Sequence, residues 1–372
     1  MALTGLARRL ADSRVVLTCG TGGVGKTTTA AALALGEAAR RRVLVLTIDP
    51  AKRLADALGV DLSRAEPVRV WSAESASGSA GGYLDALMLD VKGTFDRVIE
   101  RYAPDAATAR TILTNPLYKS LSAMITGSQE YMAMEKLYEV AGSGNYDLIV
   151  VDTPPAAHAV DFLQGPQRLV RALTDSMLQL FVRPSLAAGR IGAKLLNKGA
   201  DWVMHLFGRL TGVEILQEMA DLVMSTVSLF GGFSERAAAV KRLLREPTTC
   251  FCVVTTPQVT VIADTIDFFR EVEAEGLQLG GAIVNRMLPV LPGCDAGDPE
   301  IYPQALRESL QAIMEWYTTQ LSAERSCVEQ LRKALPFETP VVTLPWQLTD
   351  LHRIDGLQEL ARLLFAGPLL DR

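Results

Sequence analysis

A short segment near the N-terminus combines glycines, a lysine and a threonine at a spacing that suits phosphate binding. Gly20 is followed, after four residues, by Gly25-Lys26-Thr27, which satisfies the phosphate-loop pattern. Glycines let backbone N–H groups turn inward, and a following helix adds its positive end. Lys26 would contact the β and γ phosphates of a nucleotide, and the Thr27 hydroxyl would ligate Mg²⁺. The segment therefore predicts a site for a polyphosphate and a magnesium ion.

This pattern requires a strand before the loop and a helix after it. The apolar run 15–17 precedes the loop, and the Ala- and Leu-rich run 30–35 follows it. An ordinary glycine-rich turn before a helix is the alternative, which this context disfavours. We expect nucleotide contacts from the whole loop: Gly20, Thr21, Gly22, Gly23, Val24, Gly25, Lys26, Thr27 and Thr28.

Two acidic residues follow further apolar segments. The runs 43–48 and 148–151 are nearly all apolar, which is typical of strands covered on both faces in a parallel sheet. Asp49 follows the first run, and Asp152 closes the second in the form of a Walker B element. Asp152 would hold Mg²⁺ through a water molecule. Because nucleotides bind at the carboxyl ends of such strands, we expect Lys26, Asp49 and Asp152 to converge there.

The segment 20–28, Gly-Thr-Gly-Gly-Val-Gly-Lys-Thr-Thr, resembles a deviant phosphate loop. That loop belongs to the family containing nitrogenase iron protein, MinD/ParA-type partition ATPases and ArsA-type arsenite-pump ATPases. The family usually has a second, signature lysine directly after the first glycine, which reaches across a dimer to the partner's nucleotide. Thr21 occupies that position here. Because threonine brings no charge, the resemblance does not extend to a cross-dimer cation.

Two further segments narrow the resemblance to ArsA-type ATPases and the eukaryotic targeting ATPase for tail-anchored membrane proteins. Asp49-Pro50-Ala51 looks like their switch I, which implies that Asp49 orients the attacking water near Mg²⁺. A carboxylate that caps the next helix is the alternative. The segment 152–163 is similar to their switch II and includes His158, to which we assign a positioning role without proton transfer.

The resemblance also implies an adenine site in the last third of the chain. Asn285 closes an expected strand over 279–286 and matches the family's adenine-reading asparagine. Its carboxamide offers the donor and the acceptor that adenine N6 and N7 require. Pro345 follows a last expected strand, where relatives have an adenine-loop proline.

The pattern predicts an α/β phosphate-loop NTPase with a mostly parallel sheet flanked by helices and an inserted helical subdomain. We expect a nucleotide-binding core over 1–164, including a helical segment over 83–143, and its remainder over 246–372. Between them, 165–245 reads as an all-helical insert rich in methionine. Methionines suit a surface that accepts varied apolar shapes, so the insert is either a groove for hydrophobic clients or a packed helical core.

Composition limits the classes of partner and compartment. The chain is 49% hydrophobic and 21% charged with a net charge of −5, which indicates a folded protein without a basic field for nucleic acid. The first 14 residues lack the continuous apolar core of a signal peptide, and no run approaches about 20 apolar residues. We therefore expect a cytoplasmic protein.

Together these features predict a Mg²⁺-dependent ATPase with ATP and Mg²⁺ as cofactors. Hydrolysis would drive the two switches and rearrange the helical insert, which handles hydrophobic or membrane-protein clients. The alternatives are an arsenite or anion efflux ATPase and a low-turnover subunit paired with a lysine-bearing relative. No cysteine lies between Cys19 and Cys250, so the insert offers arsenite no soft ligand. The zinc-binding Cys-x-x-Cys that joins the two subunits of the eukaryotic targeting ATPase is also absent, so a homodimer or heterodimer would rely on surface contacts and nucleotide.

Overall fold

The computed structural model describes residues 5–73, 81–115, 118, 129–154, 235–290, 303–347 and 353–366. The chain divides into two compact units. The first comprises residues 1–89, 140–160 and 242–372, and the second comprises residues 90–139 and 161–241. The predicted boundaries at 164 and 245 stay predictions, because 155–234 lies outside the described residues.

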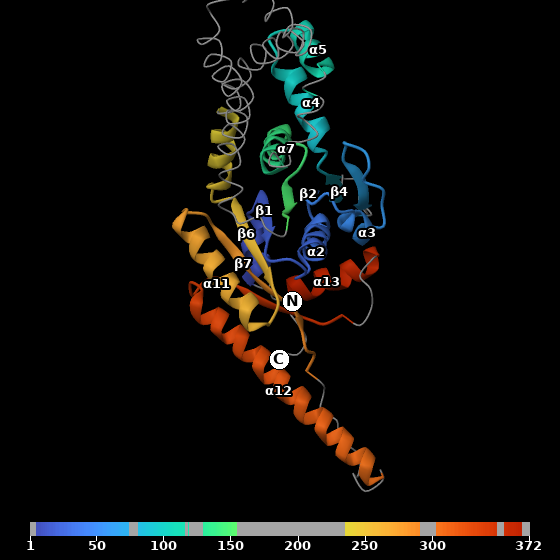
Figure 1. Cartoon of the computed structure of the whole chain (residues 1–372), viewed down its shortest axis with the longest axis vertical. Coiled ribbons are helices and arrows are strands. Elements are labelled where there is room, and N and C mark those ends of the chain that lie inside the picture. The colour runs from blue at the N-terminus through green and yellow to red at the C-terminus, as the bar shows by residue number, and fades with distance from the viewer. Residues whose placement is uncertain are drawn as a thin grey trace, which may run out of the picture. The chain divides into compact units, whose positions relative to one another are not determined.

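The first unit is built on an eight-stranded sheet with the order β3-β4-β2-β5-β1-β6-β7-β8 (Figure 1). All neighbouring strands are parallel except β3 and β4. This arrangement confirms the predicted mostly parallel sheet. The strands are β1 (Val15–Cys19), β2 (Arg42–Thr47), β3 (Val68–Ser72), β4 (Tyr83–Met88), β5 (Leu148–Asp152), β6 (Thr249–Thr255), β7 (Leu279–Met287) and β8 (Val341–Pro345).

Helices cover both faces of this sheet. The chain passes from β1 through α2 toward β2, and from β6 through α11 toward β7, in opposite directions along the sheet. Right-handed crossovers therefore place α2 and α11 on opposite faces. The reversal falls between β1 and β6, where nucleotides bind in doubly wound folds. The described helices of this unit are α1 (Gly5–Ala11), α2 (Lys26–Ala38), α3 (Arg53–Leu58), α11 (Val259–Ala274), α12 (Gln304–Ala334) and α13 (Ile354–Ala366).

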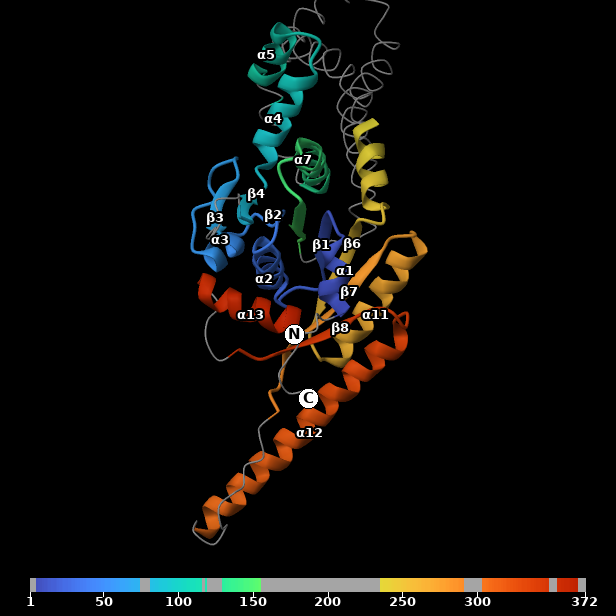
Figure 2. The ribbon, with the colours of Figure 1, turned by 180° about the vertical axis from the view of Figure 1, so that it is seen from behind.

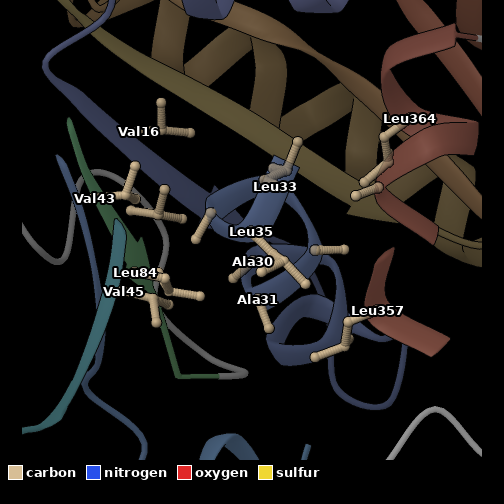
Figure 3. Close-up of a cluster of buried hydrophobic side chains, with 14 of the residues drawn as sticks. Val16, Ala30, Ala31, Leu33, Leu35, Val43, Val45, Leu84, Leu357 and Leu364 are labelled. Atoms are coloured by element: carbon tan, nitrogen blue, oxygen red, sulfur yellow. The ribbon is translucent and has the colours of Figure 1, made fainter. Parts of the chain in front are cut away.

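The core on one face surrounds α2. Alanines and leucines of α2 are buried between strand side chains and the apolar face of α13 (Figure 3). Small side chains let the helix approach the sheet closely, which fixes the position of its N-terminus beside the carboxyl ends of the central strands. The residues labelled in Figure 3 are Val16, Ala30, Ala31, Leu33, Leu35, Val43, Val45, Leu84, Leu357 and Leu364.

The segment Tyr83–Met88 forms a strand, which corrects the prediction of a helix from residue 83. It pairs in parallel with β2 and antiparallel with β3. Asp85 is buried in this strand. Its carboxylate is satisfied there, because it forms an ion pair with Arg69 and accepts a hydrogen bond of 2.9 Å from the Tyr146 hydroxyl. These partners are distant in sequence, so the local helical pattern misled the prediction.

The described part of the second unit is helical, as predicted for most of 83–143. It contains α4 (Val91–Tyr102), α5 (Ala106–Thr114) and most of α7 (Gln129–Ser143). Asp90 and Asp105 cap α4 and α5 by accepting hydrogen bonds from backbone N–H groups. A buried ion pair joins Arg236 to Glu135 of α7 at 2.8 Å, and the Arg236 guanidinium lies 3.8 Å from the Tyr102 ring centroid. Among the described residues, no helix combines the length and apolar character needed to cross a membrane.

Candidate functional site: a nucleotide cradle at the ends of the parallel strands

The predicted phosphate loop joins β1 to α2 and requires glycine at two positions. Gly20 and Gly25 have φ angles of 146° and 94°. A Cβ atom at Gly20 would lie 2.1 Å from the Val254 carbonyl oxygen, and one at Gly25 would lie 2.4 Å from Asn285 Nδ2. The loop is therefore shaped by contacts with β6 and β7 as well as by its own sequence.

Lys26 opens α2 and is almost completely buried, with 6% of its surface exposed. Its Nζ atom donates a hydrogen bond of 2.8 Å to the Thr21 carbonyl oxygen, so the ammonium group lies against the loop. Burial lowers the pKa of Lys26, and the negative charges of Asp152 and Asp49 oppose this shift. The ammonium group thus lies near acidic and carbonyl oxygens that favour a cation. Phosphate oxygens would favour it in the same way.

Asp152, at the end of β5, is fully buried. Its Oδ2 atom accepts a hydrogen bond of 2.9 Å from the Thr47 hydroxyl, whereas Oδ1 makes no hydrogen bond with the described residues. Burial raises the pKa of Asp152 to about 6, and the nearby Thr27 hydroxyl, the Thr47 hydroxyl and the Lys26 charge oppose the increase. An unpaired carboxylate oxygen beside a threonine hydroxyl fits a Mg²⁺ ion, which prefers oxygen ligands and retained waters. When bound, the ion would neutralise charge on the phosphates.

Asp49 lies after β2, and its charge acts on both Lys26 and Asp152. Its Oδ1 atom accepts a hydrogen bond of 2.9 Å from the Ala51 backbone N–H, and its Oδ2 atom lies 3.4 Å from Arg53 Nη1. These contacts shape the turn before α3, but the N-cap of that helix is Lys52 and no side chain caps it, so Asp49 does not act as the helix cap of the alternative. The role of Asp49 in orienting water stays a prediction.

Asn285 lies near the end of β7, beside the loop. Its Nδ2 atom donates a hydrogen bond of 2.9 Å to the Val24 carbonyl oxygen, and its Oδ1 atom accepts one of 2.9 Å from the Arg286 backbone N–H. The carboxamide therefore ties β7 to the phosphate loop, and adenine recognition by this group stays a prediction. Pro345 ends the adjacent strand β8, where Met287 is its register partner.

The sequence interpretation missed three polar residues around the site. Thr47 holds Asp152, Arg53 pairs with Asp49, and the Thr153 hydroxyl donates a hydrogen bond of 2.8 Å to the Thr18 carbonyl oxygen. Thr47 and Arg53 flank the Asp-Pro-Ala segment, so their proximity in sequence was the available signal. His158 and most of switch II lie outside the described residues, as does the predicted client groove up to residue 234.

Comparison with known proteins agrees with this geometry. A model of the family described as anion-transporting ATPase matches residues 13–324. The chain belongs to the ArsA-type anion-transporting ATPase family. The ATPase GET3 of Chaetomium globosum is 27% identical over 306 residues, which cover 82% of each chain. The Entamoeba dispar ATPase ASNA1 homolog is 26% identical over 287 residues, 74% of this chain and 77% of that protein. Protein Rv2184c of Mycobacterium tuberculosis is 27% identical over 329 residues, 86% of this chain and 68% of that protein.

The family membership confirms the resemblance to ArsA-type ATPases noted in the sequence and the predicted class of enzyme, an ATPase. The phosphate loop, Asp49 and Asp152 all lie within the matched residues. In this member of the family, the predicted phosphate loop follows β1, next to the point where the strand order reverses, and Lys26 and Asp152 beside it are both buried.

Proposed function

We propose that this ArsA-type ATPase hydrolyses ATP in a Mg²⁺-dependent reaction and uses the two switches to rearrange its helical part. The observation that carries the proposal is the convergence of Lys26, Asp49 and Asp152 at the carboxyl ends of β1, β2 and β5. The loop amides and Lys26 would bind the phosphates. Thr27 and Asp152 would hold Mg²⁺, and Asp49 would orient the water.

Titration calorimetry with Mg²⁺-ATP tests the cradle directly. We expect Lys26→Ala to weaken binding about 100-fold or more, because the cation lies against the loop. Lys333→Ala is the matched control, since it removes an exposed lysine of α12 and should leave affinity unchanged. A folded Lys26→Ala protein that bound ATP as tightly as the parent would contradict the proposal.

Asp49→Asn separates hydrolysis from binding. The amide retains the acceptor for the Ala51 N–H but loses the charge that would polarise water, so we expect turnover to fall about 100-fold with ATP affinity nearly unchanged. The comparison of kcat with the calorimetric Kd checks this expectation. Equal turnover in the two proteins would leave Asp49 with only a structural role, through its contacts with Ala51 and Arg53.

The proposed clients are hydrophobic or membrane-protein helices, and the proposed assembly is a dimer of this chain or with a related ATPase. Support comes from the methionine-rich sequence of 165–245 and from relatives named GET3 and ASNA1. Purification of the nucleotide-bound protein together with apolar helical segments would support this role. Stimulation of hydrolysis by arsenite would instead favour the efflux alternative.

A second candidate is a low-turnover nucleotide-binding subunit, which one observation favours. Thr21 stands where the family resemblance predicts a cross-dimer lysine. In that case hydrolysis by the chain alone would be slow, and mixing with a lysine-bearing relative would accelerate it.

A further inference from the structure

An exposed indole ring follows the last strand of the sheet. Trp346 comes directly after Pro345, the final residue of β8, and 55% of its surface is exposed. Strands β7 and β8 lie side by side at one edge of the sheet (Figure 2). Because β1, β6, β7 and β8 are parallel, their carboxyl ends face the same way. Trp346 therefore lies at the end of the sheet that carries the phosphate loop.

A short series of contacts connects Trp346 with that loop. The Trp346 backbone N–H donates a hydrogen bond of 2.7 Å to the Met287 carbonyl oxygen. The guanidinium carbon of Arg286 lies 6.0 Å from the centroid of the indole ring. The preceding residue, Asn285, donates its hydrogen bond to the Val24 carbonyl oxygen in the loop. The indole is therefore beside the expected adenine site and close to the phosphate loop in the fold.

The end of β7 is distorted beside this indole. Arg286 has a φ angle of 60°, and among the described residues it is the only non-glycine residue with a positive φ angle. The register of β7 against β8 shifts between Val284 and Met287, as at a bulge. Bulges redirect side chains next to binding sites, and strained backbone is also concentrated at such sites. The distortion therefore favours a ligand-binding role for this end of the two strands.

The polar groups around the ring already have partners within the chain. Both polar atoms of the Asn285 carboxamide bond to backbone groups, and the Pro345 carbonyl oxygen accepts a hydrogen bond of 2.9 Å from the Gln347 side chain. Among the described residues, a nucleobase placed here would thus meet polar groups that are in use and one large apolar ring face. Stacking on an aromatic ring tolerates different bases, because every base has a π face.

We propose that the base of the bound nucleotide stacks on Trp346, on the ring face that Arg286 leaves free, and that the site accepts purine nucleoside triphosphates as a class. The overlap of two fused rings with the indole depends little on their exocyclic groups, so ATP and GTP are both held. A pyrimidine has one ring and overlaps less. The inference deepens the proposed function and rests on it, since it names the substrate class of the same site.

Titration calorimetry with Mg²⁺ complexes of ATP, GTP, CTP and inorganic tripolyphosphate tests the stacking contact. In the parent, the Kd for GTP should lie within about 10-fold of that for ATP, and CTP should bind more weakly than both. Trp346→Ala should weaken ATP and GTP binding about 10- to 100-fold, whereas Trp346→Phe, which retains a ring, should weaken it only about 3-fold. Tripolyphosphate has no base, so all three proteins should bind it equally. This comparison separates stacking from damage to the phosphate loop.

Phe337→Ala is the matched control. Phe337 is a fully exposed aromatic residue that precedes β8, so it lies toward the amino end of the strand, away from Trp346. Its removal should leave the affinity for all four ligands unchanged.

Tryptophan fluorescence gives an independent readout of contact with the ring. ATP and GTP should quench the emission of the parent and quench that of Trp346→Phe much less. Equal quenching in the two proteins would contradict stacking on this indole.

Four calorimetric results would overturn the inference. They are an unchanged ATP affinity in Trp346→Ala, an equal loss of ATP and tripolyphosphate affinity in that variant, CTP binding as tight as that of ATP, and GTP binding more than about 10-fold weaker than that of ATP. Failure of the proposed function looks different. A parent that binds neither ATP nor tripolyphosphate would remove the phosphate cradle, whereas a parent whose ATP binding depends on Lys26 but not on Trp346 would remove the stacking contact alone.

Discussion

Asp152 is the buried carboxyl group that we propose as a Mg²⁺ ligand, and its ionisation also affects folding. It lies at the buried end of β5, and Thr47 holds one of its oxygens while the other has no partner among the described residues. The fold therefore tolerates an ionised group that burial disfavours. The free-energy cost of burying an ionised carboxylate is typically retained at sites that bind a cation.

This arrangement predicts how stability and Mg²⁺ affinity depend on pH. The pKa of Asp152 rises from an ordinary value of 3.8 to about 6 in the folded state, so its protonated form stabilises the fold at low pH. That contribution is lost as the pH rises through about 6, whereas Mg²⁺ affinity should increase over the same range. Asp152→Asn should make the free energy of unfolding depend less on pH in this range, and it should abolish the pH dependence of Mg²⁺ affinity.

Urea unfolding and Mg²⁺-ATP calorimetry between about pH 4 and pH 8 measure the two effects. Asp85→Asn is a useful comparison, because it alters a carboxyl group that is paired with Arg69 far from the loop. If unfolding free energy and Mg²⁺ affinity varied with pH in the same way in the parent and in Asp152→Asn, Asp152 would not be the titrating group.

At this scale, spacing alone predicted Lys26, Thr27 and Asp152, because the phosphate loop and the strand that ends in an acid are local patterns. The bond between Asn285 and Val24 could not be predicted, because it joins residues that only the sheet order brings together. Thr47 was missed for a similar reason, since its partner Asp152 lies on the neighbouring strand.

At the scale of elements, the phosphate loop depends on strands that come much later in the chain. Gly20 is closely backed by β6, whereas a Cβ atom at Gly23 would meet nothing within 4 Å. Both residues have positive φ angles, so an alanine is strained at either position. A comparison of alanine variants at Gly20 and Gly23 therefore distinguishes the cost of backbone strain from the cost of the contact with β6.

We expect Gly20→Ala to destabilise the protein by about 3 kcal/mol or more, because the added methyl group collides with the Val254 carbonyl oxygen. Gly23→Ala should cost about 1 kcal/mol from its φ angle alone. Urea midpoints of the two variants measure the difference. Equal destabilisation would show that strain rather than the β6 contact dominates.

The strands β2 and β5 beside the site were predictable, since their apolar runs are continuous and bounded. The strand Tyr83–Met88 was not, because the pairing of Asp85 with Arg69 and Tyr146 is a tertiary effect. The helix expected after the loop from the run 30–35 is α2, which ends at Ala38, since β2 begins at Arg42 and a short turn must separate them.

At the scale of the whole molecule, the missing signature lysine and the proposed dimer are linked. Thr21 contributes its backbone carbonyl to Lys26, and this contact is independent of its side chain. The side chain is partly exposed and therefore open to substitution. A lysine at this position would act only on the nucleotide of a second subunit, as the family resemblance implies.

Thr21→Lys should raise the ATP hydrolysis rate per chain by about 10- to 100-fold, through added charge stabilisation in the transition state. The gain should grow with protein concentration, because a cross-dimer group acts only in the dimer. Steady-state kinetics over a range of concentrations measure both effects, with Thr21→Ala as the control. A gain that is the same at every concentration would place the lysine in its own subunit's site.

The order of strands in the sheet also has a consequence during synthesis on the ribosome. β1 is flanked by β5 and β6, and Val15 is in register with Ile149 and Thr249. An emerging polypeptide therefore exposes the apolar surface of β1 until both neighbours have been translated. Nucleotide binding should thus appear late in translation, and chains stalled before β6 should need protection by a chaperone.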